Sequence, residues 1–418
     1  MLIIPNIFKE YDIRGKIGKE LNDAVAYKLG QLFSYNAKQQ TVVIARDNRK
    51  SSISFLKFLS QGLTNSGCSV IELEGVCTSP QLYFASSYLK ANGAIMITGS
   101  HNNLEYNGFK FMLEQKSFYG EKLKSIISNP IVAGTGSYNF IKLDSEYAQA
   151  LMKSINITKN FKIAWECNNS GVAKLLKILK LPGRHLYLNI ETDGKFAHQL
   201  PDPLIEKTLD QIKQIVISEQ CDYGFAFDGD GDRLVMLNSK GQVLNGDQLI
   251  YLLALSFKNS SNKKILLDVK ASNILIEFLE ESGFEVILAA SGHSLMKTRI
   301  VKENALLALE LSGHIVINDS KYLPFDDALY VALRLIEYLQ NNPIVFLPLA
   351  PFGEEYKIPK VLSLNPQIYK PEGLRKSFND GFYLIRASNT EDYILVKYEA
   401  LNQERINLIE KEIEQLLN

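Results

Sequence analysis

The chain has 418 residues, of which 46 are Lys or Arg and 46 are Asp or Glu, so its formal net charge is zero. A chain of this length is too long for a single hydrophobic core, and the usual domain size of about 100 to 200 residues predicts two to four domains. The balanced charge excludes a global field that would attract nucleic acid or an anionic membrane surface.

Two further features of the composition indicate a cytoplasmic enzyme. The N-terminus lacks the pattern of a signal peptide, and no apolar run approaches the roughly 20 residues that span a bilayer, so no membrane association is expected. The four cysteines are widely spaced and match no metal-binding pattern, so we expect buried, reduced thiols. They are Cys68, Cys77, Cys167 and Cys221.

Up to about residue 130, apolar runs of strand length alternate with segments of helical period. We expect strands over 41–45, 69–73 and 94–98 and helices over 23–34, 52–65 and 79–89. This alternation predicts an α/β layer with helices on both faces of the sheet.

A serine with an exposed hydroxyl is expected directly after the third of these strands. Ser100 lies there in the sequence Thr98-Gly99-Ser100-His101-Asn102-Asn103, and functional loops of α/β sheets lie at the carboxyl ends of strands. A serine nucleophile needs activation, for which His101 and Lys110 are the nearby candidates. Ordinary hydrogen-bonded loop residues are the alternative interpretation.

The second unit carries the densest charge of the chain. Strands are expected over 162–165, 186–190, 223–227 and 234–237, and helices over 172–179 and 203–217. Between the last two strands lie Asp228, Asp230 and Asp232, separated by glycines, which allow a loop to turn all three carboxylates toward one point.

Oxygen-only ligands of this kind favour Mg²⁺, Mn²⁺ or Ca²⁺ over zinc. A calcium-binding EF-hand loop also begins with alternating aspartates, but it requires Gly at its sixth position and Glu at its twelfth. Here those positions are Arg233 and Ser239. The pattern therefore predicts a magnesium site, with a solvated acidic turn as the alternative.

The third unit repeats the same order of elements, which suggests internal duplication. We expect helices over 246–256, 273–282 and 327–340 and strands over 264–268 and 285–289. Several polar residues fall at the junctions of these elements. They are Lys270, the turn Ser291-Gly292-His293 and the sequence Glu310-Leu311-Ser312-Gly313-His314.

The last part of the chain is rich in proline, which indicates a linker and loops. Strands over 383–385 and 393–398 flank the sequence Arg386-Ala387-Ser388-Asn389-Thr390, and a final helix carries Ile406, Ile409 and Ile413 at helical spacing. A guanidinium, hydroxyls and an amide on one tight loop predict a phosphate cradle. An ordinary hairpin turn that contains an arginine is the alternative.

A magnesium loop, a serine and a separate anion cradle indicate that phosphate is handled in two places. A kinase would need a nucleotide-binding glycine-rich loop, and neither of the usual patterns occurs at a strand-to-helix junction. A simple phosphatase needs one phosphate site.

Taken in order, these motifs resemble those of the α-D-phosphohexomutase family, and within it the phosphomannomutase/phosphoglucomutase branch. The matching motifs are residues 98–102 with 106–110, 228–233, 310–314 and 386–390, and residues 10–15, 268–270 and 291–294 match as well. The resemblance thus spans essentially the whole chain.

The resemblance implies an α/β protein of four domains around a central cleft. Three similar α/β layers with mixed sheets would occupy residues 1–142, 143–242 and 243–342 and carry the catalytic serine loop, the metal-binding loop and the sugar-binding loop. A C-terminal α+β domain over 343–418 would carry the phosphate-binding loop and close on the substrate.

The implied activity is the interconversion of hexose 6-phosphate and hexose 1-phosphate, of mannose and/or glucose. Ser100 would carry a phosphoryl group, pass it to the sugar monophosphate to make a bisphosphate, and take back the other phosphoryl group after the intermediate reorients. Ser100, Asp228, Asp230 and Asp232 would bind Mg²⁺, and hexose 1,6-bisphosphate would serve as activator and intermediate.

The family pattern also implies roles for the other motif residues. The implied catalytic residues are Ser100, His101, Lys110, Arg233 and His293, with acid–base duty open among Lys110, His101 and His293. The implied substrate-binding residues are Tyr11, Arg14, Lys270, Glu310, Ser312, His314, Arg386, Ser388, Asn389 and Thr390. The partner would be a hexose phosphate, and the protein a monomer or small homo-oligomer.

The chain departs from the family pattern at Asn103 and Asp392, where proline is usual, although neither change removes a ligand. Phosphoglucosamine mutase is one alternative, but that branch typically has glycine and glutamine where this chain has Asn389 and Leu311. A non-catalytic sugar-phosphate-binding protein and a magnesium-dependent phosphatase are the others. Glucose and mannose both remain as substrates, because they differ only at the 2-hydroxyl.

Overall fold

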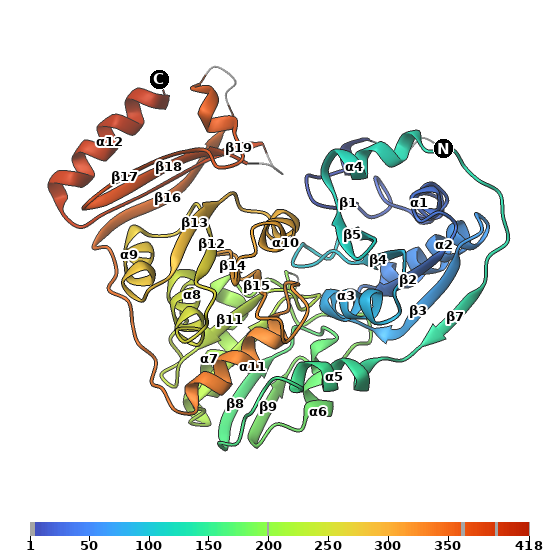
Figure 1. The fold of residues 1–418 in the computed structure, drawn as a ribbon, viewed down its shortest axis with the longest axis horizontal. Coiled ribbons are helices and arrows are strands. Elements are labelled where there is room, and N and C mark those ends of the chain that lie inside the picture. The colour runs from blue at the N-terminus through green and yellow to red at the C-terminus, as the bar shows by residue number, and fades with distance from the viewer. Residues whose placement is uncertain (1–4, 199, 361–363, 389–391, 418) are drawn as a thin grey trace. The chain divides into compact units, whose positions relative to one another are not determined.

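The computed structural model describes residues 5–198, 200–360, 364–388 and 392–417. Figure 1 shows the helices and strands of the chain with their labels. Contacts between residues divide the chain into two compact units. The first comprises Met1–Leu244 and Ser312–Asn341, and the second comprises Asn245–Leu311 and Asn342–Asn418. No helix of the described ranges combines the length and the apolar character that crossing a membrane requires.

The first sheet of unit one is mixed and has the order β1-β5-β4-β2-β3-β7, with β6 beside β5. Strand β2 is parallel to β3 and β4, whereas β5 is antiparallel to β4 and β1. The strands are β1 (Ile13–Lys16), β2 (Thr41–Arg46), β3 (Ser69–Val76), β4 (Gly93–Ile97), β5 (Tyr106–Leu113), β6 (Lys116–Phe118) and β7 (Tyr138–Ile141).

Helices cover both faces of this sheet, as the sequence predicts. Val42 and Ile44 of β2 pack in one cluster with α1 and α2, and Val43 and Ala45 pack in another with α3, because successive strand side chains point to opposite faces. The helices and short turns are η1 (Pro5–Ile7), α1 (Asp23–Asn36), α2 (Lys50–Thr64), α3 (Ser79–Tyr88), α4 (Gly120–Lys124) and η2 (Ser125–Ser128).

Local chemistry explains where these helices begin and how closely they pack. Asn22 caps α1 by accepting a hydrogen bond from the Val25 amide, and Thr78 with Gln81 forms a capping box at α3. Helices α1 and α2 cross at glycines, since a β-carbon at Gly62 would lie 2.0 Å from the Tyr27 carbonyl oxygen.

The second sheet of unit one has the order β11-β10-β8-β9, with β8 parallel to β9 and β10 and with β11 antiparallel to β10. Its elements are α5 (Asp144–Met152), β8 (Phe161–Glu166), α6 (Val172–Leu179), β9 (Gly183–Leu188), η3 (Glu206–Leu209), α7 (Asp210–Ser218), β10 (Tyr223–Phe227) and β11 (Leu234–Leu237). Unit one also contains β15 (Ile315–Ile317) and α11 (Ala328–Leu339).

Two predicted elements of this region are wrong in their bounds. The α-helix expected over 203–217 begins only at Asp210, and the residues before it form the 3-10 helix η3 (Glu206–Leu209), where the Thr208 hydroxyl bonds the carbonyls of Asp202 and Ile205. The strand expected over 186–190 lies earlier, since its parallel pairing with β8 starts at Gly183.

Unit two contains parallel strands in the order β13-β12-β14, and a separate antiparallel sheet in the order β16-β19-β18-β17 that packs against α12. Its elements are α8 (Gly246–Leu255), β12 (Lys264–Asp268), α9 (Asn273–Glu281), β13 (Glu285–Ala289), α10 (His293–Lys302), β14 (Leu307–Leu309), β16 (Phe352–Pro359), η4 (Pro366–Tyr369), β17 (Leu374–Phe378), β18 (Gly381–Ala387), β19 (Tyr393–Ala400) and α12 (Gln403–Leu417).

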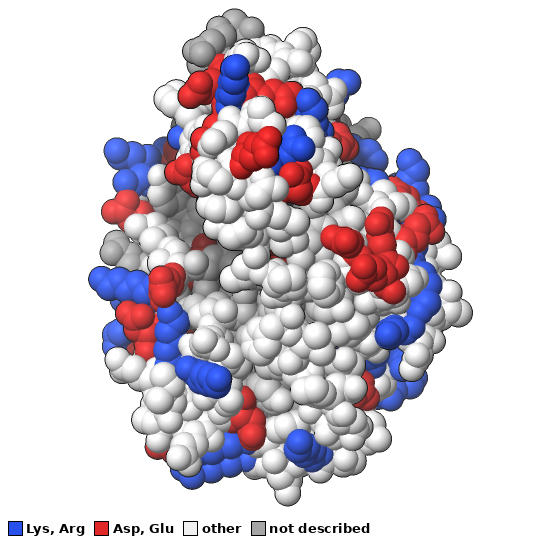
Figure 2. Space-filling model, turned by 90° about the vertical axis from the view of Figure 1, so that its left-hand side faces the viewer, with Lys and Arg blue, Asp and Glu red and all other residues white. Residues whose placement is uncertain are grey.

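The predicted architecture of three α/β layers and a C-terminal α+β domain is confirmed. The sequence pattern missed several elements, including β16 and β17 in the proline-rich region. All four cysteines are free and buried, as expected. On the face of the molecule in Figure 2, acidic and basic side chains are interspersed, as the equal numbers of both signs suggest.

Candidate active site

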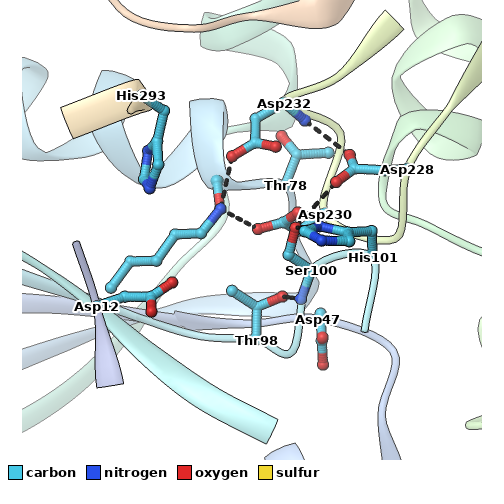
Figure 3. Close-up of polar contacts among 12 residues, drawn as sticks. Asp12, Asp47, Thr78, Thr98, Ser100, His101, Asp228, Asp230, Asp232 and His293 are labelled. Carbon is cyan, nitrogen blue, oxygen red and sulfur yellow. Dashed lines mark hydrogen bonds and ion pairs between the residues drawn. The ribbon is translucent and has the colours of Figure 1, made fainter. Parts of the chain in front are cut away.

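The three aspartates lie where β10 turns into β11, in the loop predicted from their spacing. Asp228, Asp230 and Asp232 are fully buried, and each offers one carboxylate oxygen within 4.8 Å of the others. Gly231 makes the turn possible with a φ of 72°, a region that favours glycine. The Asp228 carboxylate also accepts a hydrogen bond from the Asp232 amide, at 3.1 Å, which closes the loop on itself (Figure 3).

Lys110 of β5 enters this acidic cluster. Its Nζ lies 2.6 Å from Asp230 Oδ2 and 2.5 Å from Asp232 Oδ2, and the side chain is almost fully buried. Burial by itself would lower the pKa of Lys110, but the two carboxylates outweigh it and raise the pKa well above its ordinary value. Lys110 is therefore a fixed cation inside the site.

The aspartates respond unequally to these surroundings. Burial, together with the charges of Asp232 and Asp230, raises the pKa of Asp228 well above its ordinary value. Burial acts in the same direction on Asp230, but Lys110 reverses it and lowers the pKa of Asp230. One lysine thus leaves part of the negative charge of the cluster uncompensated.

The residues of the cluster fit a divalent cation. The Oδ1 atoms of Asp230 and Asp232 are buried and, within the described part of the chain, accept no hydrogen bond. Buried polar atoms are normally hydrogen-bonded, so these two buried carboxylate oxygens, which accept no such bond, are suited to a metal ion. Because all the donors are oxygen, a hard ion is favoured over zinc.

Ser100 lies beside the first aspartate. Its hydroxyl donates to Asp228 Oδ2 at 3.0 Å and lies 3.1 Å from His101 Nδ1. The expectation of an exposed hydroxyl is wrong, since Ser100 is only 1% exposed. The aspartate loop covers the serine loop: a β-carbon at Gly229 would lie 2.8 Å from the Ser100 carbonyl oxygen.

His101 and Arg233 continue the network around the serine. Arg233 Nη2 lies 3.4 Å from His101 Nε2, and Arg233 Nε donates to His314 Nε2 at 3.0 Å. Burial, and next the charge of Arg233, lowers the pKa of His101 well below its ordinary value. His101 is therefore a neutral imidazole at neutral pH.

The contacts of His314 define its tautomer. A guanidinium nitrogen can only donate, so Nε2 accepts and the proton of the neutral ring is on Nδ1, which lies 3.1 Å from Asp326 Oδ2. Asp326 is a residue that the motif analysis missed. His314, predicted to bind substrate, here orients Arg233.

Arg14 is also brought to the serine loop. Its Nε lies 2.9 Å from Asp12 Oδ2, and its Nη1 donates to Asn102. Burial alone would lower the pKa of Arg14, but Asp12 reverses the effect and the pKa is raised. Tyr11 is half-buried, with its ring centroid 5.9 Å from that of Tyr119.

Sequence reasoning missed three further residues of this site. Ser79, at the start of α3, donates its hydroxyl to Asp230 at 2.6 Å. Asp47 and Arg49 contact the serine loop directly. The available signal was their position, because both follow β2 at the same edge of the sheet where Ser100 follows β4.

The remaining predicted residues are described within their own units. In unit two, Asp268 lies 3.5 Å from Lys270 Nζ and, as the largest influence, raises the pKa of Lys270. Glu310 accepts from the Gly292 amide at 3.0 Å, and His293 Nδ1 lies 3.3 Å from Lys297 Nζ. Ser312 is half-buried in unit one.

The loop predicted to bind phosphate follows β18. Arg386 Nη1 donates to the Pro371 carbonyl at 3.2 Å, while its Nε is buried and has no partner among the described residues. Ser388 donates its amide to the Tyr393 carbonyl. Asn389 and Thr390 lie outside the described residues.

The site places a serine hydroxyl against a buried carboxylate cluster, with a lysine and an arginine nearby. This arrangement is typical of enzymes that transfer phosphoryl groups with the help of a metal ion. Comparison with known proteins defines the class further. Four family models for phosphoglucomutase/phosphomannomutase match in order along the chain. They are α/β/α domain I over residues 5–135, domain II over 145–241, domain III over 245–345 and the C-terminal domain over 351–416.

Individual relatives agree with these models. The chain is 32% identical to a phosphoglucomutase of Neisseria gonorrhoeae, over 98% of this chain and 96% of the relative. It is 31% identical to a phosphomannomutase/phosphoglucomutase of Pseudomonas aeruginosa, over 97% and 94%. A crystal structure of a phosphoglucomutase/phosphomannomutase family protein from Burkholderia thailandensis matches with a TM-score of 0.90 at 30% identity, covering 100% of this chain and 98% of that one.

The chain therefore belongs to the phosphoglucomutase/phosphomannomutase family and is an enzyme of the hexose phosphate mutase class. The family is generally metal-dependent, and the acidic cluster could bind a metal ion.

Proposed function

We propose that this mutase interconverts the 1- and 6-phosphates of glucose and/or mannose through a phosphoserine at Ser100 and a hexose 1,6-bisphosphate. The observation that carries the proposal is the 3.0 Å contact of the Ser100 hydroxyl with Asp228, the first of three clustered carboxylates. A hydroxyl that stores a phosphoryl group must lie where its added negative charge is compensated.

The charge on a phosphorylated Ser100 would be balanced by a metal ion and by fixed cations. Asp228, Asp230 and Asp232 would hold Mg²⁺ together with the serine-bound group. When bound, the ion supplies positive charge to the phosphoryl oxygens. Lys110, Arg14 and Arg233 add positive charge from the protein, which favours the charge distribution of a transferring phosphoryl group.

The first transfer breaks the bond between phosphorus and Ser100 Oγ and forms a bond between phosphorus and a sugar hydroxyl oxygen; that hydroxyl loses a proton, and Ser100 Oγ gains one. The second transfer, after the bisphosphate reorients, breaks the bond between the other phosphorus and its sugar oxygen and re-forms the bond to Ser100 Oγ, and the protons move in the opposite direction. His101 contributes on the serine side, because Arg233 faces its Nε2, so the Nδ1 proton points toward Ser100 Oγ. Lys110, with its raised pKa, contributes charge. His293 remains a candidate for the proton of the sugar.

The reaction also requires that the protein bind the sugar and the phosphate group that is not reacting. The motif residues that do not surround Ser100 are suited to this binding. We assign the sugar hydroxyls to Glu310 and Ser312. Arg386, Ser388, Asn389 and Thr390 would hold the distal phosphate, with Lys270 and Tyr11 as further ligands. The buried Nε of Arg386, which has no hydrogen-bond partner among the described residues, supports this role.

The proposal retains the four-domain assignment at residues 1–142, 143–242, 243–342 and 343–418, because every family model begins and ends inside the corresponding range or within three residues of it. It also includes a cytoplasmic location and a monomer or small homo-oligomer.

A coupled assay tests the proposal. Purified protein is given glucose 1-phosphate, mannose 1-phosphate or glucosamine 1-phosphate with Mg²⁺, with and without glucose 1,6-bisphosphate. We expect conversion of one or both of the first two and activation by the bisphosphate. Conversion of the glucosamine phosphate alone would indicate a phosphoglucosamine mutase, stoichiometric release of phosphate would indicate a phosphatase, and binding without conversion a non-catalytic protein.

The variant Ser100→Ala should lose mutase activity by several orders of magnitude with its circular dichroism unchanged, since no other hydroxyl contacts Asp228 among the described residues. Ser128→Ala, at an exposed serine that ends the 3-10 helix η2, is the matched control and should retain full activity. Near-normal turnover by Ser100→Ala would refute the phosphoserine.

A further inference from the structure

Arg49, which belongs to none of the sequence motifs, makes four hydrogen bonds to the serine loop, residues 99–106. It follows β2 and is 2% exposed. Its Nη1 donates to the carbonyls of Asn103 and Tyr106 at 3.0 and 2.9 Å, and its Nη2 donates to those of Ser100 and Asn102 at 2.9 and 2.6 Å. One guanidinium therefore holds four carbonyls of the loop that carries the serine.

Asp47 holds this guanidinium in place. Its Oδ2 lies 3.2 Å from Arg49 Nε and also accepts the Gly99 amide at 3.2 Å. Its Oδ1 accepts the Arg49 amide at 2.9 Å and the Ser52 hydroxyl at 2.6 Å. All five N–H groups of the guanidinium thus have an acceptor, and none is left for a phosphate.

Gly99 shows how tightly the guanidinium fits. A β-carbon at this position would lie 2.5 Å from both Arg49 Cζ and Arg49 Nε. The residue before the serine must therefore be glycine because Arg49 occupies the space that any side chain would need.

The contacts of Arg49 support an unusual backbone at Ser100. Ser100 has a φ of 48°, in the left-handed region that residues with side chains rarely adopt. Such conformations persist where the surroundings hold them, and they gather at active sites. Arg49 bonds the Ser100 carbonyl on one side, and the Thr98 hydroxyl accepts the Ser100 amide at 2.7 Å on the other.

We propose that Arg49 is a positioning residue for phosphoryl transfer at Ser100: it holds residues 99–106 in the conformation that directs the Ser100 hydroxyl at Asp228. The inference rests on the proposed phosphoserine. Arg49 acts through backbone carbonyls, so it should affect the rate at which Ser100 is phosphorylated and not the affinity for the sugar phosphate. Lysine cannot replace it, because a single ammonium cannot span four carbonyls in a fixed plane.

The test compares Arg49→Lys with Arg46→Lys. Arg46 ends the same strand and donates a single bond to the Asp47 carbonyl, so it is a matched control for the loss of a guanidinium. Phosphorylation of Ser100 by glucose 1,6-bisphosphate is followed by rapid quench and intact mass, and kcat and KM are measured in the steady state. Hydrogen–deuterium exchange reports the order of the peptide that spans residues 98–106.

We expect Arg49→Lys to slow Ser100 phosphorylation and kcat by about 100-fold, the effect of misplacing a reacting atom by about 1 Å, with KM within about threefold of wild type. Exchange in residues 98–106 should become faster, while the rest of the protein and Arg46→Lys stay as in wild type. Gly99→Ala should cause a similar loss, and combining it with Arg49→Lys should add little, because both changes disturb the same contact.

The outcomes separate the two claims. If wild-type protein is not phosphorylated at Ser100, the proposed function fails and the role of Arg49 fails with it. If wild-type protein is phosphorylated and Arg49→Lys is equally fast, or if KM rises as much as kcat falls, only the role of Arg49 is overturned. Unchanged exchange in residues 98–106 would overturn it as well.

Discussion

The substitution Lys110→Met removes a buried cation that contacts two buried carboxylates. Lys110 Nζ lies 2.6 Å from Asp230 and 2.5 Å from Asp232, and both aspartates are fully buried. Methionine keeps most of the volume of the side chain, so the main effect is to leave the carboxylates without their counter-charge. Removing one partner of a buried ion pair costs about 3 to 5 kcal/mol.

This cost should appear in thermal unfolding of the metal-free protein. A loss of about 3 to 5 kcal/mol lowers the Tm of a domain of about 150 to 250 residues by about 6 to 20 °C. Saturating Mg²⁺ should recover a large part of the loss, because a divalent ion supplies to the carboxylates the charge that the ammonium supplied. Differential scanning calorimetry with EDTA and with Mg²⁺ measures both quantities.

Lys116→Met is the control, since Lys116 is exposed on the strand that pairs with β5; its Tm should be that of wild type in both buffers. A fall of less than about 2 °C for Lys110→Met in EDTA would show that the cluster is not held together by Lys110. If Mg²⁺ raised the Tm of neither protein above its value in EDTA, the carboxylates would not bind the ion.

Three other predictions concern different parts of the chain. Burial, opposed in part by hydrogen bonds from Asn168 and Asn189, raises the pKa of Glu166 from 4.5 to about 7. Between these two pKa values the folded protein holds a proton that the unfolded chain has released, so the free energy of unfolding should fall as the pH rises from 4.5 to about 7. Glu166→Gln should flatten the dependence of Tm on pH. Gly62→Ala should lower the free energy of unfolding, measured in urea titrations, by about 1 to 3 kcal/mol, because the new β-carbon would lie 2.0 Å from the Tyr27 carbonyl oxygen. The control Lys57→Ala, at an exposed position of the same helix, should change the free energy of unfolding by about 0.5 kcal/mol or less. Arg386→Lys should raise the KM for glucose 6-phosphate about tenfold or more, because lysine loses the two parallel hydrogen bonds to phosphate; an unchanged KM would contradict the phosphate grip.

The sequence alone determined the features that depend on neighbours along the chain. Strands β10, β11 and β12 and helix α6 have the bounds that their apolar patterns predict. The aspartate loop follows from three acids alternating with glycines, and the position of Ser100 from the end of a buried strand. The order of the four motifs was sufficient to indicate the family, since each motif is short but their joint order is specific.

The tertiary structure decided what those residues contact. The sequence predicts that Ser100 is an exposed loop serine, but the aspartate loop, which belongs to another sheet, covers it. Arg49 is separated from Ser100 by fifty-one positions, so no local pattern could reveal that it holds the serine loop. His314, which the family resemblance assigns to the substrate, accepts a hydrogen bond from Arg233 Nε, a contact between residues eighty-one positions apart that no local pattern indicates. Burial and pairing between segments far apart in the chain set these outcomes, because the contacts of a side chain depend on which strands lie side by side.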